Sequence, residues 1–459
     1  MVAVVGPAGR TSEPPLASRA DLRRTTWALA WPVIFSFSIE SFVGLCDTLM
    51  VGRLGPTAVA AVGVGVQILS GVDSALFAVG TGALALVARH VGAGDMRAAE
   101  ETLRQSIVAA VGLATLAVFP VLIWAPHLVA AFRVDASVVE AATPFVRLVM
   151  MSVPAGAVLF VIVSSLRGAG DTRTPLAIGA VVGVVNVAAA YVLIFGRLGF
   201  PVLGVLGAAM ATALAFASGA VVGVALLLRG RLVMRLRWRS FHFRRDVVRR
   251  VLRVGYPAAL EHLLMQLGFF LYIVFAAQYG TAAVAAYFIG VRILALSFLP
   301  GVGFAAAAAT MVGQNLGGSR PVDAERSGWA ALQLSAGLMT AAGVVIFLAA
   351  RPIARLFVDD PEVIADAVSF IRVLAVAQPL MAIDFTLGGA LRGAGDTRFP
   401  LLTVLIGFYV CRLGFAWLVT FWLGLDVVWL WLALIGDYAA RSALKARRFR
   451  SGAWQLIRL

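Results

Sequence analysis

The stretch LRGAGDTRTP at Leu166–Pro175 returns as LRGAGDTRFP at Leu391–Pro400, with eight identical residues in succession. The two copies lie 225 residues apart in a chain of 459 residues. Further residues match at the same offset: Pro32 with Pro257, Gly55 with Gly280, Gly92 with Gly317, Phe132 with Phe357, Arg147 with Arg372, and Pro154 with Pro379. The sequence therefore consists of two similar halves.

The composition is that of a membrane protein. Hydrophobic residues make up 61% of the chain and charged residues 13%, whereas soluble domains have about 45–50% and about 25%. Apolar runs long enough to cross about 30 Å of hydrocarbon as helices recur along the sequence. They predict an all-α integral membrane protein with twelve transmembrane helices at 27–52, 58–86, 106–130, 138–166, 174–198, 202–229, 251–277, 282–311, 329–350, 363–391, 399–423 and 425–443.

Each half contains six of these spans, which predicts two six-helix lobes. Because six is even, the second half enters the membrane in the same direction as the first, and a pseudo-two-fold axis along the membrane normal relates the halves. Such repeats typically enclose a central cleft. The expected segments are a cytoplasmic N-terminal segment at 1–26, a lobe at 27–229, a basic cytoplasmic linker at 230–250, a lobe at 251–443 and a cytoplasmic tail at 444–459.

The net charge of +15 comes from basic residues placed mainly in the short gaps between apolar runs. Most of them lie at the termini and in the loops after the even-numbered spans, which predicts that both termini are cytoplasmic. The densest cluster, between the halves, is expected to face anionic lipid. The expected partner is membrane lipid, and binding to nucleic acid is not expected.

The repeated LRGAGDTR loops have two interpretations. Their glycines can end one helix while Asp171 or Asp396 caps the next one, ahead of Pro175 or Pro400. Alternatively, the loops contact substrate. The sequence leaves both open.

The segments WPVIFSFSIESFVGLCDTLMVGRLG in the first span and RFRSGAW near the C-terminus, together with the twin loops, resemble multidrug and toxic compound extrusion (MATE) transporters, and the DinF-like branch fits best. The similarity runs from Trp27 to Trp454. It implies two six-helix lobes that form a V, and cation-coupled efflux. The arginine-dominated, alanine-rich composition also indicates a bacterium, so we expect the bacterial plasma (inner) membrane.

Acidic residues within spans are candidates for coupling, because a carboxylate in hydrocarbon costs roughly 2.5 kcal/mol or more. Asp47 leads, since its CDT matches the family's Asp-Thr motif and Pro32 should bend the same helix. It could take a proton from the outer side and release it to the cytoplasm; a salt bridge or cap is the alternative. Glu40, two helical turns earlier, either pairs with Asp47 or caps a polar neighbour.

The resemblance also marks polar residues for the cleft. Asn186 matches a family Asn, but Ala190 stands where the family has Asp. Thr212 resembles the family's sixth-span Thr, although it could bond its own helix. Asp73 could line the cleft.

The second half supplies Glu261, His262 and Asp384, which either carry the coupling missing at Ala190 or form structural pairs. Asp384 does not fall where the sodium-linked branch places its acid. Asp437 and Arg441 are expected to pair near the cytoplasmic surface. The chain's sole lysine, Lys445, is expected in the cytoplasmic tail.

These residues predict a secondary antiporter that exchanges protons, or sodium, for organic cationic or amphiphilic compounds, with no cofactor and as a monomer. A phosphate-binding GxxxxGK[ST] loop is absent, which disfavours ATP-driven transport. A lipid-linked oligosaccharide flippase is the alternative, though the interior acids argue against it. An enzyme is disfavoured, because His90, His127, His242 and His262 lack metal-ligand spacing.

Overall fold

The computed structural model describes residues 18–230, 232–236, 242–457 and 459, and the regular elements within them are helices. Residues 1–17 of the expected N-terminal segment, and 231 and 237–241 of the expected linker, lie outside these ranges. The described residues contain 12 helices that are long and apolar enough to cross a membrane. The predicted all-helical, twelve-span membrane protein is confirmed.

The first half forms six helices, of which α3 is kinked at Trp124. They are α1 (Arg19–Gly52), α2 (Pro56–Gly92), α3 (Met96–Ala130), α4 (Ala136–Gly168), α5 (Arg173–Phe195) and α6 (Val205–Leu228). Helix α1 begins eight residues before the predicted span, because the Ser18 hydroxyl accepts a hydrogen bond from the Asp21 backbone N–H at 3.1 Å and caps a polar first turn.

The second half begins with α7 (Arg245–Ala277). Its second span is broken at Phe298 into α8 (Thr281–Ser297) and α9 (Leu299–Gly317), just before Pro300, which has no N–H to donate. The remaining elements are α10 (Pro321–Leu348), α11 (Ala350–Arg355), α12 (Pro361–Ala394), α13 (Arg398–Val404), the π-helices η1 (Leu405–Leu413) and η2 (Leu418–Leu423) on either side of α14 (Gly414–Trp417), then α15 (Val427–Arg450) and the 3-10 turn η3 (Ala453–Leu456).

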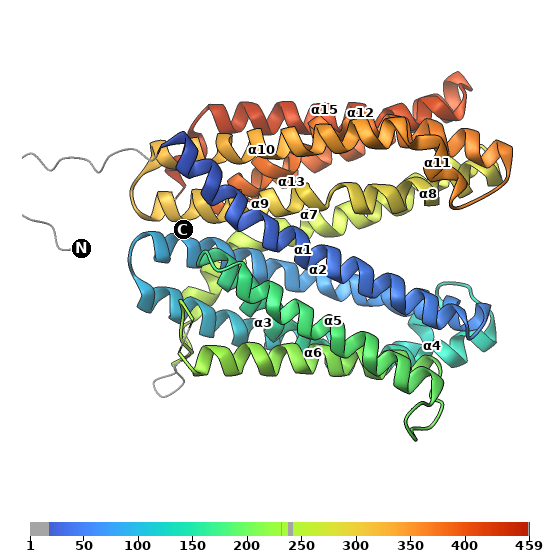
Figure 1. The fold of residues 1–459 in the computed structure, drawn as a ribbon, viewed down its shortest axis with the longest axis horizontal. Coiled ribbons are helices and arrows are strands. Elements are labelled where there is room, and N and C mark those ends of the chain that lie inside the picture. Colours follow the sequence, from blue (N-terminus) through green and yellow to red (C-terminus); the bar gives the residue numbers. More distant parts are fainter. Residues whose placement is uncertain (1–17, 231, 237–241, 458) are drawn as a thin grey trace, which may run out of the picture.

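The helices form two lobes that lie side by side (Figure 1). Helices α2 to α6 pack together in one lobe, and α8 to α15 in the other. Helices α1 and α7 cross between the lobes: α1 contacts α9 and α10 as well as α5, and α7 contacts α2 as well as η1 and α13. The first helix of each half therefore joins its own lobe to the other one.

Glycines bring the lobes into direct backbone contact at the end of the bundle that carries the chain termini. A Cβ on Gly255 of α7 would overlap the carbonyl oxygen of Ala78 of α2. A Cβ on Gly92 would overlap the Gln314 carbonyl, and one on Gly317 would overlap that of Arg89. Gly92 and Gly317 are partners at the repeat offset, so the lobes meet here through equivalent surfaces.

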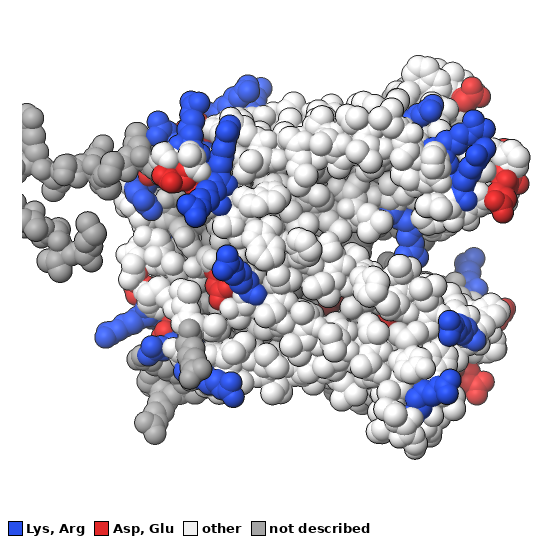
Figure 2. Space-filling model, viewed as in Figure 1, with Lys and Arg blue, Asp and Glu red and all other residues white. Residues whose placement is uncertain are grey.

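The opposite end of the molecule is hollowed between the two lobes, and the hollow lies between α8 and the end of α1 (Figure 2). Charged side chains gather at the two ends, and a broad band between them consists almost entirely of uncharged residues (Figure 2). The band fits a bilayer, and the hollow opens on the side away from the chain termini.

Candidate functional site

The leading candidate, Asp47, lies half-buried where α1 packs on α5. With its Nδ2 turned toward α1, the buried Asn186 amide donates to Asp47 Oδ1 at 3.0 Å and to Oδ2 at 3.3 Å. Within the described chain, no base forms an ion pair with Asp47. The structure thus brings together the two residues that the family resemblance selected on α1 and α5.

Two other positions that the family resemblance singled out have no hydrogen bond to Asp47 in the structure. Ala190 is fully buried on α5 and supplies no side-chain polar atom. The Thr212 hydroxyl donates to the Ala208 carbonyl of its own helix at 3.2 Å, which is the alternative that its sequence left open. The polar site therefore rests on Asp47 and Asn186.

Glu40, Asp73 and Arg167 form a second polar group in the first lobe. Glu40 lies within electrostatic range of both Arg167 and Asp73. The Arg167 guanidinium sits over the Phe37 ring, with 5.2 Å between its carbon and the ring centroid. Glu40 and Asp73 are both exposed. Glu40 is thus close enough to Arg167 and Asp73 to interact with them electrostatically, and its pairing with Asp47 stays a prediction.

His262 links the two lobes where α7 crosses α2. Its Nδ1 lies 2.9 Å from the Ser74 hydroxyl, and its ring stacks on Phe77 with 5.2 Å between centroids. The neighbouring Glu261 points to the second lobe instead, where Arg392 Nη1 donates to its two carboxylate oxygens at 3.1 and 3.2 Å. His262 is thus placed as a bridge, and Glu261 as half of an ion pair.

Asp384 on α12 is held by two bases from α15. Arg441 Nη2 and Lys445 Nζ donate to its two oxygens, each at 2.6 Å, and all three residues are buried. The placement of Lys445 in the cytoplasmic tail was wrong, because α15 continues to Arg450 and carries Lys445 into the lobe core. Its ammonium is stable there because Asp384 neutralises it.

Asp437 and Arg441 do pair, with 3.8 Å between oxygen and nitrogen, and both side chains are buried in the protein; their place near the cytoplasmic surface stays a prediction. The Asp437 side chain is 0% exposed and also lies 3.8 Å from Arg412 Nη1 of η1. The Arg412 guanidinium is enclosed by three aromatic rings, those of Phe269, Tyr272 and Phe408. Those aromatics pack in the core around a base.

The sequence did not lead us to expect that Asp384, Asp437, Arg412, Arg441 and Lys445 form one buried charged cluster. The signal was present on α15, where Asp437, Arg441 and Lys445 follow one another at intervals of four residues and so share one helix face. Two arginines that correspond at the repeat offset have other partners: Arg147 donates to the Leu122 carbonyl, and Arg372 lies over the Phe347 ring.

The two lobes differ at equivalent positions. At the repeat offset, Asp47 corresponds to Tyr272 and Asn186 to Cys411. Tyr272 is fully buried and donates its hydroxyl hydrogen to the Leu430 carbonyl. The second lobe therefore has a core tyrosine where the first has its unpaired acid.

Two six-helix lobes, joined by crossing helices and carrying polar groups within their spans, define a multi-pass membrane transporter. The MatE family matches residues 32–192 and 257–418, two segments that begin at the prolines paired by the repeat. The chain belongs to the MatE family.

Relatives and solved structures cover nearly all of the chain. A probable multidrug resistance protein NorM of Thermotoga maritima is 29% identical over 95% of this chain and 94% of its own, and an uncharacterized transporter YisQ of Bacillus subtilis is 28% identical over 96% of both. A MOP superfamily transporter from Pyrococcus furiosus aligns with a TM-score of 0.88 at 23% identity, over 95% of this chain and 97% of its own. The fold is that of these transporters.

Proposed function

We propose that this protein is a secondary active efflux transporter that exchanges protons for organic, cationic or amphiphilic compounds by alternating access. The observation that carries the proposal is Asp47, an acid within a span whose described polar partner is a neutral amide. An amide can donate to a carboxylate through its N–H and accept from a carboxylic acid through its oxygen. The Asp47 site is therefore compatible with both protonation states.

The acids of the second lobe are less suited to the coupling role. Asp384 is bound by two cations and Glu261 by one, so protonating Asp384 would leave the buried Lys445 unpaired, and protonating Glu261 would leave the half-buried Arg392 unpaired. We therefore assign proton coupling first to Asp47, with Glu40 and Asp73 as further acids of the same lobe, and give Glu261 and Asp384 structural roles.

The arrangement of the lobes supports alternating access. They are closed by glycine contacts at one end and hollowed at the other, and α1, which carries Asp47, packs on both lobes. With cytoplasmic termini, as the arginine distribution predicts, the hollow opens outward. Protonation of Asp47 from that side and its deprotonation from the other would then drive the exchange.

The substrate class is inferred from the relatives, several of which are named as probable multidrug resistance proteins. An accessible acid attracts organic cations, and Glu40 and Asp73 are exposed acids in the same lobe. The relatives come from bacteria, so we place the protein in the bacterial plasma membrane, as a monomer.

The test is ethidium transport in proteoliposomes under an imposed pH gradient and, separately, a sodium gradient. We expect the pH gradient to drive transport by the wild type. The Asp47→Asn variant should transport at least tenfold more slowly, because the amide cannot release a proton. Glu140→Gln is the matched control, since Glu140 is an exposed acid at the start of α4, and it should transport at the wild-type rate.

If Asp47→Asn pumps normally, Asp47 is not the coupling group. If only the sodium gradient drives transport, the protein exchanges sodium, and not protons, for its substrate. If neither gradient moves any cationic dye, the antiporter proposal itself is lost.

A further inference from the structure

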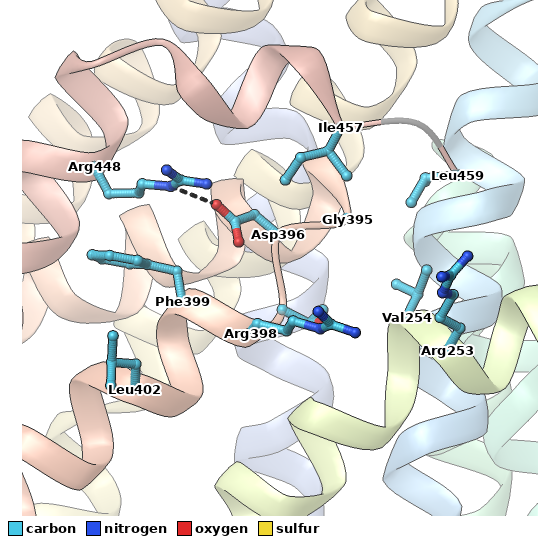
Figure 3. A pocket seen from close by; sticks show the side chains of 11 residues that line it. Arg253, Val254, Gly395, Asp396, Arg398, Phe399, Leu402, Arg448, Ile457 and Leu459 are labelled. Atoms are coloured by element: carbon cyan, nitrogen blue, oxygen red, sulfur yellow. Dashed lines mark hydrogen bonds and ion pairs between the residues drawn. The ribbon is translucent and has the colours of Figure 1, made fainter.

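A cavity of about 570 Å³ lies at the end of the bundle that carries the chain termini, and no step of the proposed transport cycle uses it. Figure 3 shows its walls: the first half of α7, the loop between α12 and α13, the start of α13, the end of α15 and the last residues of the chain. The lining residues are Arg253, Val254, Gly395, Asp396, Thr397, Arg398, Phe399, Leu402, Arg448, Ile457 and Leu459.

The cavity has an excess of positive charge. Arg448 Nε donates to Asp396 Oδ2 at 2.8 Å, and its guanidinium carbon lies 5.4 Å from the Phe399 ring centroid (Figure 3). Asp396 is buried, with 6% of its surface exposed, so the pair is a fixed part of the wall. Arg253 and Arg398 are exposed, and neither has an ion pair with a described residue. The side chains that line the cavity thus include three guanidiniums and one carboxylate, and the carboxylate is paired with Arg448.

The repeat shows that two of the three arginines of this cavity have no basic counterpart in the first half. In the first copy of LRGAGDTR, Asp171 accepts a hydrogen bond from the Thr174 backbone N–H at 3.0 Å and so caps its own turn. In the second copy, Asp396 is held by Arg448 instead. At the repeat offset, Arg253 corresponds to Ala28 and Arg448 to Gly223. The same octapeptide therefore has a capping role in one half and forms a basic cavity wall in the other.

We propose that this cavity binds the phosphate group of an anionic membrane lipid. Guanidiniums match phosphate oxygens through paired, charge-assisted hydrogen bonds, and Arg253 and Arg398 form no ion pair with any acid in the described part of the chain. Val254, Phe399 and Leu402 supply apolar surface beside the charge for the start of the acyl chains. The cavity also lies at the arginine-rich end of the bundle, where basic pockets between helices meet lipid headgroups.

A lipid in this cavity would fasten α7 to the rest of its lobe. Arg253 lies on α7 only two residues before Gly255, which contacts α2 of the other lobe, whereas Arg398 lies on α13 and Arg448 on α15. The bound phosphate bridges these elements and stabilises the folded chain by mass action. This inference does not depend on which ion or substrate is transported.

The experiment measures lipid retention by the full, delipidated chain in detergent, using native mass spectrometry with phosphatidylglycerol and phosphatidylcholine as probes. We expect phosphatidylglycerol to be retained at least tenfold more strongly than phosphatidylcholine, and Arg253→Gln/Arg398→Gln to abolish the difference. Arg173→Gln is the matched control, because Arg173 is exposed at the equivalent position of the first loop, and it should keep the preference.

Two further measurements make the result decisive. Thermal unfolding should show that phosphatidylglycerol raises the midpoint of the wild type and of Arg173→Gln but not that of the double variant. Inorganic phosphate and glycerol phosphate should compete only at concentrations far above that of the lipid. Equal retention of both lipids, or equal loss in Arg173→Gln, overturns the site. Competition by soluble phosphate at the lipid's concentration overturns the lipid as its ligand.

Discussion

At the scale of single residues, the intramembrane acids fall into two kinds. Asp47 has a neutral amide as its partner, whereas Asp384 has two cations at 2.6 Å. The desolvation of a buried charge is costly unless an opposite charge compensates it, so Asp384 and its bases stabilise one another in the ionised form. Asp47 has no such compensation. We infer that an acid with a neutral partner, such as Asp47, takes part in transport. An acid that is paired with bases, such as Asp384, stabilises the fold.

Asp384→Asn should destabilise the protein by about 3–5 kcal/mol, because it leaves Lys445 buried without a counter-charge and removes the closer of the two acidic partners of Arg441. The measurement is thermal unfolding in detergent. Adding Lys445→Met should recover part of the loss, since it removes the buried charge that Asp384→Asn leaves unpaired. An unfolding midpoint equal to that of the wild type would show that Asp384 is not a structural ion pair.

At the scale of elements, α1 and α7 connect the lobes, and their close approach depends on glycine. Gly255 lets α7 reach the α2 backbone at Ala78, and at the repeat offset Gly303 of α9 lies against Ala30 of α1. These two contacts are equivalent, because Gly255 corresponds to Ala30 at the repeat offset and Ala78 corresponds to Gly303. Both crossing helices thus pack through the same surface.

Gly255→Leu should weaken the contact between α7 and α2 by about 1–3 kcal/mol, because the side chain would meet backbone that cannot move aside. We expect a lower unfolding midpoint together with slower dye transport. The control is Gly63→Leu on α2, where a Cβ meets nothing within 4 Å. Equal effects from the two substitutions would contradict the role of the close contact.

At the scale of the whole molecule, the lobes meet around a pseudo-two-fold axis near Ala88 and Gly313. These residues are partners at the repeat offset, and a Cβ on Gly313 would lie 2.7 Å from that of Ala88. Such self-contact is expected where an axis passes through an interface. The end of the bundle around this axis must open if the lobes alternate.

Ala88→Cys/Gly313→Cys, with the native Cys46 and Cys411 replaced by serine, should lock this end closed when oxidised. A disulfide needs about 3.5–4.5 Å between Cβ atoms, which a small shift of the helices supplies. We expect oxidation to lower dye transport by the double-cysteine variant at least tenfold and a reductant to restore it. Oxidation should not change the transport rates of the two single-cysteine variants. Undiminished transport by the cross-linked protein would show that the lobes need not separate here.

Several features could be predicted from the sequence because they depend on the chain alone. Twelve spans follow from apolar runs and bilayer thickness, and the two-lobe plan follows from the duplicated LRGAGDTR loops. Asp47 and Asn186 were selected by resemblance, and the structure joins them by hydrogen bonds. The helix ends were less accurate, because polar turns beyond the bilayer, such as those of α1 and α15, extend helices past their apolar runs.

The sequence by itself determined that this protein crosses the membrane as two related bundles and that a few acids lie within the spans, because hydropathy and repetition are local properties of a chain. Only the tertiary structure decided which acids are paired. Asp384 is 57 residues from Arg441 and 61 from Lys445, and Arg448 is 52 from Asp396. Whether such charges meet depends on how the helices pack and which faces they turn toward one another.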